Sequence, residues 1–106
     1  MIKSNTFFIK NFKNVVFIGE HGSLKELVKI NQSLNLNTKI VTSKDQSLSL
    51  KKQNLEFKIF DTLNEKFKKF IKKDFNIDET LFLSIRSRWI FKKNDIKKFF
   101  KNNLIN

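Results

Sequence analysis

The sequence has no cysteine, proline, alanine or tyrosine, and its 106 residues include only two glycines, one histidine and one tryptophan. Without cysteine, disulfides, thiolate-bound zinc and thiol catalysis are excluded. The single histidine, His21, argues against a histidine-based metal site and against a self-contained Ser-His-Asp triad. No apolar run approaches the about 20 residues needed to cross a bilayer, and the apolar stretch near the start is too short for a signal peptide. We therefore expect a soluble, cytoplasmic protein that has no membrane contact and no metal.

Negative charge is scarce, because 10 Asp and Glu residues stand against 22 Lys and Arg residues and leave a net charge of +12. Such an excess is typical of proteins that bind nucleic acid, since clustered cations release counterions from phosphates. Here the lysines are spread from Lys3 to Lys101 and take the polar positions of the predicted helices. Two arginines are few for reading bases or phosphates. A solvated basic surface is the favoured interpretation, and nucleic-acid binding remains the alternative.

The hydrophobic pattern predicts alternating strands and helices. Short apolar or β-branched runs predict strands at 14–19, 38–43, 55–60 and 79–85, and the start of a fifth at 103–106. Apolar residues at helical spacing predict helices at 23–35, 61–75 and 94–103, with a weaker one after residue 45. This alternation predicts a single Rossmann-like α/β domain of three layers, with a mostly parallel sheet of four strands plus the start of a fifth between helices. Residues 1–12 fit no repeat, although they contain a segment that could add an edge strand.

Capping residues predict where the helices start. Ser23 and Glu26 form one S-x-x-E capping box, and Thr62 and Glu65 form a T-x-x-E box of the same kind. Asn94 is a candidate cap for the last helix.

Three loops follow the carboxyl ends of the predicted strands, where open parallel sheets bind ligands. The first loop, with Gly19, His21, Gly22 and Ser23, lacks the G-x-G-x-x-G dinucleotide fingerprint. It predicts either an anion site at a helix start or a turn with a cap, and both need the same residues. His21 fits a ligand contact or a solvated loop residue. The second loop contains Asp45 at the position of ribose-binding acids, and a helix cap explains this aspartate equally well.

The third loop belongs to SIRSRWIFKK, residues 84–93, which follows an apolar strand and contains the only two arginines of the chain. In one interpretation Trp89, Ile90 and Phe91 anchor the loop and the arginines are solvated. In the other, the loop forms an apolar slot with cationic edges that suits a flat, acidic ligand.

The stretch LFLSIRSRWIFKKNDIKKFFKNNLIN, residues 81–106, resembles the corresponding part of the folate-dependent formyltransferases. NVVFIGEHGSLKEL, residues 14–27, is similar to their first strand and helix. The family includes enzymes that act on methionyl-tRNA, on phosphoribosylglycinamide and on amino sugars linked to nucleotides. The similarity is greatest to members with a loop like S-x-x-S-R-W-I-F-K. It implies transfer of a formyl group from 10-formyltetrahydrofolate to a small-molecule amine, such as an amino sugar nucleotide, or to an aminoacyl-tRNA-like acceptor.

The resemblance also assigns residues to the site. The implied cofactor-binding residues are Arg86, Ser87, Arg88, Trp89, Ile90 and Phe91. The implied substrate-binding residues are Gly19, His21, Gly22 and Ser23, the last two matching a phosphate-binding Gly-Ser turn. Asn106 is similar to the catalytic asparagine that opens the family's N-x-H motif and would steady the developing oxyanion.

Because the sequence stops at this asparagine, the resemblance implies the N-terminal part of a catalytic domain, residues 1–106, truncated at the start of the motif. Such a part lacks the His and Asp that manage protons, and we expect it to be inactive alone. Two other classes remain open, a non-catalytic α/β nucleotide-binding module and a basic nucleic-acid-binding module. The sequence does not indicate the oligomeric state.

Overall fold

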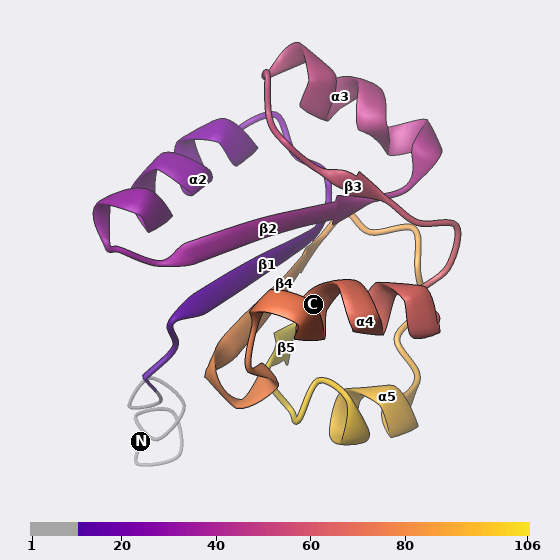
Figure 1. Cartoon of the computed structure of the whole chain (residues 1–106). Helices are drawn as coiled ribbons and strands as arrows, with labels where there is room; N and C mark the ends of the chain where they lie inside the picture. The colour runs from indigo at the N-terminus through magenta and orange to yellow at the C-terminus, as the bar shows by residue number, and fades with distance from the viewer. Residues whose placement is uncertain (1–10) are drawn as a thin grey trace.

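The computed structural model describes residues 11–106, which form a five-stranded, all-parallel sheet with helices on both faces (Figure 1). The strand order is β3-β2-β1-β4-β5, so that β1 lies in the centre. In chain order the elements are β1 (Asn14–Gly19), α2 (Leu24–Ser33), β2 (Asn37–Thr42), η1 (Lys44–Gln46), α3 (Ser47–Lys52), β3 (Lys58–Ile59), α4 (Glu65–Asp74), η2 (Ile77–Glu79), β4 (Thr80–Ile85), α5 (Lys93–Lys98) and β5 (Leu104–Ile105). The predicted Rossmann-like α/β fold is therefore confirmed. The candidate edge strand near the start falls on residues 1–10, outside the described part.

The central strand β1 is the apolar run that the sequence marks as doubly buried. All six of its residues are buried, and it pairs in parallel with β2 on one side and β4 on the other. Asn14 begins both pairings, opposite Asn37 and Thr80, and its side chain bonds to both of these residues. These two side-chain hydrogen bonds align the starts of three strands.

Side chains alternate between two hydrophobic cores, one on each face of the sheet. Val15 and Phe17 pack with Leu24 of α2 and Leu50 of α3. Val16 and Ile18 pack on the opposite face, beneath α4 and α5. Phenylalanines fill much of this second core, where the rings of Phe82 and Phe100 lie 4.8 Å apart, edge to face. A chain without alanine has few small residues that would let helices approach closely, and here large aromatic rings fill the space between the helices and the sheet.

Two helix starts differ from the predicted capping boxes. Ser23 does precede α2, but within the described residues its side chain makes no capping hydrogen bond. For α4 the predicted cap at Thr62 is wrong, because the N-cap is Asn64, whose Oδ1 accepts from the N–H groups of Lys66 at 3.0 Å and Phe67 at 3.4 Å. Asparagine is at least as good a cap as threonine, so its position two residues later decides where the helix begins.

The elements at the sheet edges are shorter than predicted. β3 has two residues, which pair with Val41 and Thr42, because the chain after α3 turns at Asn54 (φ 57°) and reaches β2 late. α5 ends at Lys98, and Asn94 lies inside it, since Lys92 is its N-cap. Left-handed residues at 101 and 102 then turn the chain into β5.

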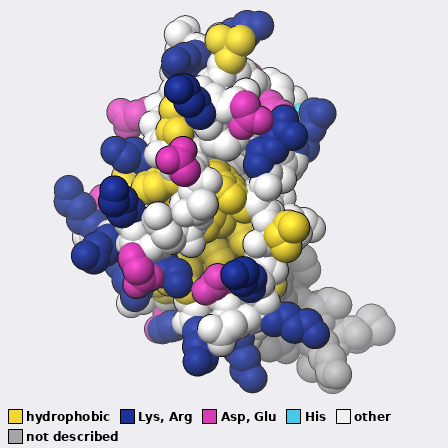
Figure 2. All heavy atoms as spheres, turned by 90° about the vertical axis from the view of Figure 1, so that its right-hand side faces the viewer, with side chains coloured by type: hydrophobic (Ala, Val, Ile, Leu, Met, Phe, Trp, Pro, Cys, Tyr) yellow, Lys and Arg dark blue, Asp and Glu magenta, His cyan; other side chains and the backbone are white. Residues whose placement is uncertain are grey.

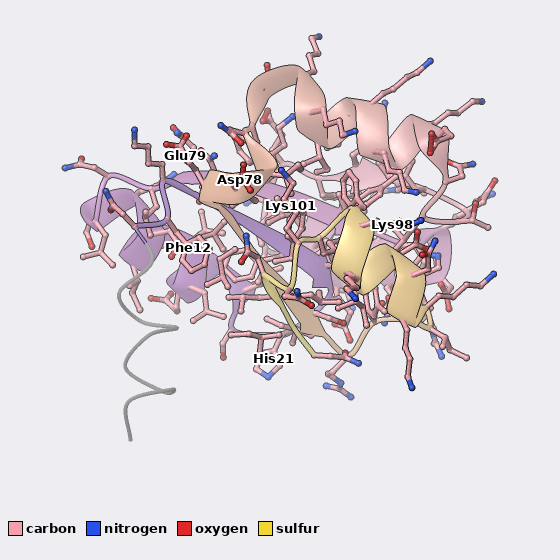
Figure 3. All side chains as sticks on the ribbon, turned by 90° about the horizontal axis from the view of Figure 1, so that it is seen from below. Phe12, His21, Asp78, Glu79, Lys98 and Lys101 are labelled. Atoms are coloured by element: carbon pink, nitrogen blue, oxygen red, sulfur yellow. The ribbon has the colours of Figure 1, made fainter. Side chains whose placement is uncertain are left out.

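On the lower side of the molecule, the turn after α5 is joined to η2. Lys101 Nζ lies 3.0 Å from Asp78 Oδ1, and Figure 3 shows the two side chains from below. Asn103, fully buried, donates from Nδ2 to the Ile77 carbonyl. Among residues 11–106, no helix combines the length and apolar character needed to cross a membrane.

Candidate functional site

The loops after β1 and β4 contact each other at the carboxyl ends of the strands. β1 ends at Gly19 with φ +121°, and a Cβ atom there would lie 1.9 Å from the Ile85 carbonyl oxygen. The next residue, Glu20, donates its N–H to the same carbonyl at 3.0 Å. Position 19 needs a glycine because the backbone at the end of β1 lies too close to the backbone at the end of β4 for any side chain to fit.

A buried glutamine holds the loop after β4 through a hydrogen bond to its backbone. Arg86 has a left-handed backbone (φ 52°), and its carbonyl accepts from Gln46 Nε2 at 2.6 Å. Gln46 belongs to η1, after β2, and is 9% exposed. Sequence reasoning missed this residue, since a glutamine among polar loop residues has no pattern that distinguishes it.

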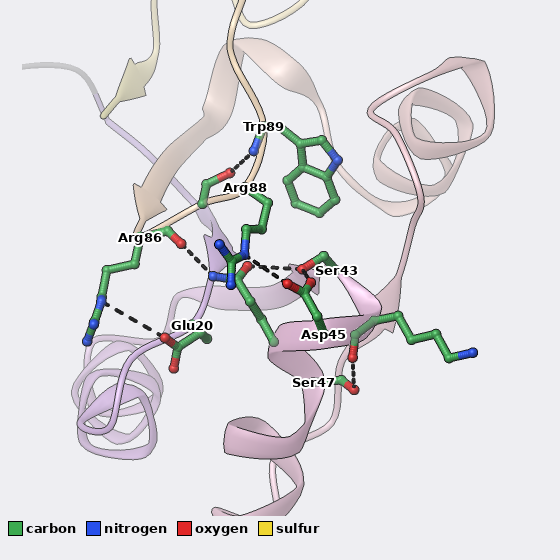
Figure 4. A network of polar contacts seen from close by, with 10 residues as sticks. Glu20, Ser43, Asp45, Ser47, Arg86, Arg88 and Trp89 are labelled. Carbon is green, nitrogen blue, oxygen red and sulfur yellow. Dashed lines mark hydrogen bonds and ion pairs between the residues drawn. The ribbon is translucent and has the colours of Figure 1, made fainter.

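An ion pair fixes the same loop from the side of β2 (Figure 4). Arg88 Nε lies 2.9 Å from Asp45 Oδ2, and the Ser43 hydroxyl donates to Asp45 Oδ1 at 2.5 Å. The hydrogen bond from Ser43 and the positive charge of Arg88 lower the pKa of the Asp45 carboxyl. Asp45 is therefore no cap of α3, whose N-cap is Gln46. A weaker pair joins Arg86 Nε to Glu20 Oε1 at 4.0 Å.

Trp89 is held by two hydrogen bonds. Its backbone N–H donates to Ser87 Oγ at 3.0 Å, and its indole Nε1 donates to the Asp61 carbonyl at 3.1 Å. Trp89 and Phe91 pack against the core under α4 and α5, as the anchor interpretation predicts. Ile90 does not, because it is 93% exposed between them. Ile90 therefore does not anchor the loop.

Trp89 separates two hollows and, among the described residues, is alone in lining both. The first, which we name the charged hollow, has a volume of about 750 Å³ and is lined by Ser43, Lys44, Asp45, Phe60, Asp61, Arg88 and Trp89. The second, the apolar slit, has about 280 Å³ and is lined by Thr62, Leu63, Phe67, Lys68, Trp89, Ile90, Phe91, Lys92, Asp95 and Phe100. Figure 2, which faces the right-hand side of Figure 1, shows hydrophobic side chains in the middle of this surface and charged ones around them.

The start of α2 is less open to anions than its sequence suggests. His21 Nδ1 accepts from the Ser23 N–H at 3.0 Å, and the Lys25 N–H donates to Gln53 Oε1 at 2.9 Å. The Leu24 N–H donates to the His21 carbonyl at 3.2 Å. The turn-and-cap interpretation therefore fits this loop, with His21 and Gln53 as the capping side chains. A phosphate bound by these N–H groups would have to displace them.

The predicted site residues do not all meet. Arg88 and Trp89 contact residues that follow β2 and β3, Arg86 pairs with Glu20 after β1, and Gly19 lies against the start of this loop. Asn106 is exposed and follows β5, one position beyond the pairing of Leu83 with Ile105. Within the part of the chain that the structure describes, no three acidic or histidine side chains gather as metal ligands.

Comparison with known proteins adds no relative, because no family model, curated protein or solved structure matches this chain significantly.

Proposed function

We propose that this chain takes part in the transfer of a formyl group from 10-formyltetrahydrofolate to an amine. One observation carries the proposal: residues 86–91, which resemble the family's cofactor loop, are fixed over the carboxyl ends of the strands with a hollow on each side of Trp89. Open parallel sheets bind ligands at this edge. A transfer between two molecules needs two adjoining sites, and this loop divides two.

In this proposal the apolar slit takes the flat ring system of the folate, against Trp89, Ile90 and Phe91. The acceptor amine attacks the formyl carbon, the bond from that carbon to N10 of the folate breaks, and a proton passes from the amine to N10. The amide of Asn106 would donate a hydrogen bond to the formyl oxygen as it becomes negative.

The proposal is tested by titrating the protein with 5-formyltetrahydrofolate, a stable relative of the cofactor, and following the fluorescence of Trp89, the chain's only tryptophan. Ile90→Ser is the informative variant, because Ile90 is 93% exposed and its loss should leave the fold intact. Covering an isoleucine side chain is worth about 1.5–3 kcal/mol, so this variant should bind about tenfold more weakly or worse.

Ile30→Ser is the matched control, since Ile30 lies on α2 and is 54% exposed. It should bind folate as the unaltered protein does. Absence of folate binding by both fluorescence and calorimetry, or an equal loss in the two variants, would refute the proposal.

A basic nucleic-acid-binding surface is the alternative that a specific observation favours. Eight exposed lysines on or beside α4 and α5 have no ion-pair partner among residues 11–106: Lys66, Lys69, Lys72, Lys73, Lys92, Lys93, Lys97 and Lys98. RNA bound there would depend on salt and would not need the loop at Trp89, which separates this alternative from the first proposal.

A further inference from the structure

The side of β2 that faces β3 is open over most of its length. β2 runs from Asn37 to Thr42, but β3 pairs only with Val41 and Thr42. The chain coming from α3 joins β2 only at Lys58, near the end of the strand (Figure 1). Residues 37–40 therefore have a neighbouring strand on the β1 side alone.

Backbone groups on this open side have no hydrogen-bond partner. Along a strand, successive residues turn their N–H and C=O groups toward opposite neighbours. The Thr42 carbonyl accepts from the Phe60 N–H at 3.1 Å, so Thr38 and Ile40 turn their backbone groups to the same side as Thr42. Within residues 11–106, the N–H and C=O of Thr38 and the N–H of Ile40 have no hydrogen bond.

These unpaired groups are not simply exposed to water. Ile40 is only 5% exposed, and the Thr38 hydroxyl is buried without a partner in the part of the chain that the structure describes. Buried polar groups are normally hydrogen-bonded, and each one left unpaired costs stability. A ligand that pairs with this edge would therefore recover free energy that the fold alone does not.

A groove of about 740 Å³ lies beside these groups, and Thr38 and Ile40 are among its lining residues. We name it the β2 groove. It shares no residue with the charged hollow or the apolar slit. Its apolar lining comes from α2, the turn after α2, the chain before β3 and α4: Val28, Leu36, Leu55, Phe57 and Phe70.

The complement of unpaired strand groups is another extended backbone, which supplies acceptors and donors at the same spacing. The open length of four residues corresponds to about 13 Å, or about four residues of an extended peptide. The side chains of such a peptide alternate between the two faces of the sheet. One set would lie toward Leu36, which packs against one core, and the other toward Phe70, which packs against the other.

Charge distinguishes the possible occupants. Inside the groove the charges balance in number, since Lys39 and Lys58 stand with Glu56 and Asp74. The net charge of the chain, +12, therefore decides. A second copy would bring +12 against +12, and residues 1–10 contain two lysines and no acidic residue. Both are repelled, whereas an acidic segment is attracted.

We propose that the β2 groove binds an extended, acidic segment of a partner protein, which adds a strand beside residues 37–40. The backbone of this segment bonds to Thr38 and Ile40, and its apolar side chains enter the groove. The proposal does not depend on formyl transfer, because the groove lies along the first half of β2 and the loop at Trp89 contacts the residues after β2 and β3.

Selection of a displayed library of random decapeptides on the full chain tests the proposal. The selected peptides should be acidic and rich in β-branched residues, which favour extended structure. Each is then synthesised in two forms, N-methylated at odd or at even positions. Only one form should lose affinity, because alternate residues of an added strand face the protein.

Thr38→Pro tests the same contact from the side of the protein. Proline removes the N–H that faces the groove and removes no bond to β1. It should weaken peptide binding about fivefold or more, the effect of one lost hydrogen bond. Thr38→Val is the matched control, because it keeps the N–H and a similar shape, and it should change the affinity by less than about twofold. Circular dichroism checks that both variants are folded.

Amide hydrogen exchange identifies the occupant. In the free protein the amides of Thr38 and Ile40 should exchange faster than those of Lys39 and Val41, which face β1, and the peptide should slow them. Slow exchange that depends on protein concentration would assign the groove to a second copy. Slow exchange that is lost when residues 1–10 are deleted would assign it to that segment. Either result would overturn the proposal.

Three further results would overturn it. The first is the absence of any selected peptide that binds more tightly than about 1 mM, which is the weak end of measurable affinity. The second is an equal loss of affinity in Thr38→Pro and Thr38→Val. The third is an equal effect of the two N-methylated forms, and this result decides even if Thr38→Pro does not fold.

Discussion

Gly19→Ala tests the claim that β1 and β4 meet too closely for a side chain. The added Cβ would lie 1.9 Å from the Ile85 carbonyl oxygen, whereas real Cβ contacts essentially never fall below 3.0 Å. The backbone at the end of β1 and the backbone after β4 would have to separate by about 1 Å. This shift would lengthen the 3.0 Å hydrogen bond from the Glu20 N–H to the Ile85 carbonyl beyond a useful distance.

The cost has two parts. Losing the hydrogen bond costs about 1 kcal/mol. Holding a residue with a side chain at φ +121° costs about 1–3 kcal/mol more. The free energy of unfolding should therefore fall by about 2–4 kcal/mol, a large share of the about 5–15 kcal/mol typical of a domain.

Urea unfolding followed by circular dichroism measures this change. With a slope of about 1.5 kcal/mol per molar, the midpoint should fall by about 2 M. Gly22→Ala is the matched control, because a Cβ at Gly22 meets nothing within 4 Å. A midpoint for Gly19→Ala within about 0.3 M of the unaltered protein would show that the reasoning is wrong, since at this slope that shift is only about 0.5 kcal/mol. An equal loss in the control would show the same.

The remaining predictions concern a helix cap and an exposed carboxylate. Asn64→Ala should lower the free energy of unfolding by about 1 kcal/mol, and Thr62→Ala should lower it much less, which thermal unfolding would measure. A larger loss of stability in Thr62→Ala than in Asn64→Ala would support Thr62 as the cap instead. The pKa of the Asp45 carboxyl is lowered by its hydrogen bond from Ser43 and by the nearby arginine. Its contribution to stability is therefore fully present above the ordinary Asp pKa of about 3.9 and is lost as pH falls through the lowered pKa of the folded state. Trp89 fluorescence should therefore change below about pH 4, and Asp45→Asn should remove that step; a step that persists in this variant would contradict the assignment.

The fold could be predicted because its strongest signals are local. The run at residues 14–19 is apolar at nearly every position, which suits a strand buried on both faces, and the structure places it at the centre. Helical spacing at Phe67 and Ile71 likewise marks the buried face of α4. Parallel pairing then follows from the crossover helices.

The site could be predicted only in part, because its geometry depends on contacts between distant loops. The loop around Trp89 was identified, but its two hollows arise from its meeting with residues after β2 and β3. Gln46 reaches Arg86 across 40 positions of sequence, and neither residue type demands the other. At the start of α2, the Lys25 N–H that a Ser23 cap would bind donates instead to Gln53, a residue 28 positions away.

The position of β1 in the sheet also has a consequence for folding. Asn14 and Thr80, which begin the β1–β4 pairing, are 66 positions apart, so the centre of the sheet closes through a very long loop. At about 5–20 residues per second, a ribosome needs about 3–13 s to make that interval. After β2 has been made, β1 can pair with β2 but not yet with β4 for the rest of this interval. The most deeply buried strand of the finished protein is therefore the one that waits longest during synthesis with the backbone N–H and C=O groups of one edge unpaired.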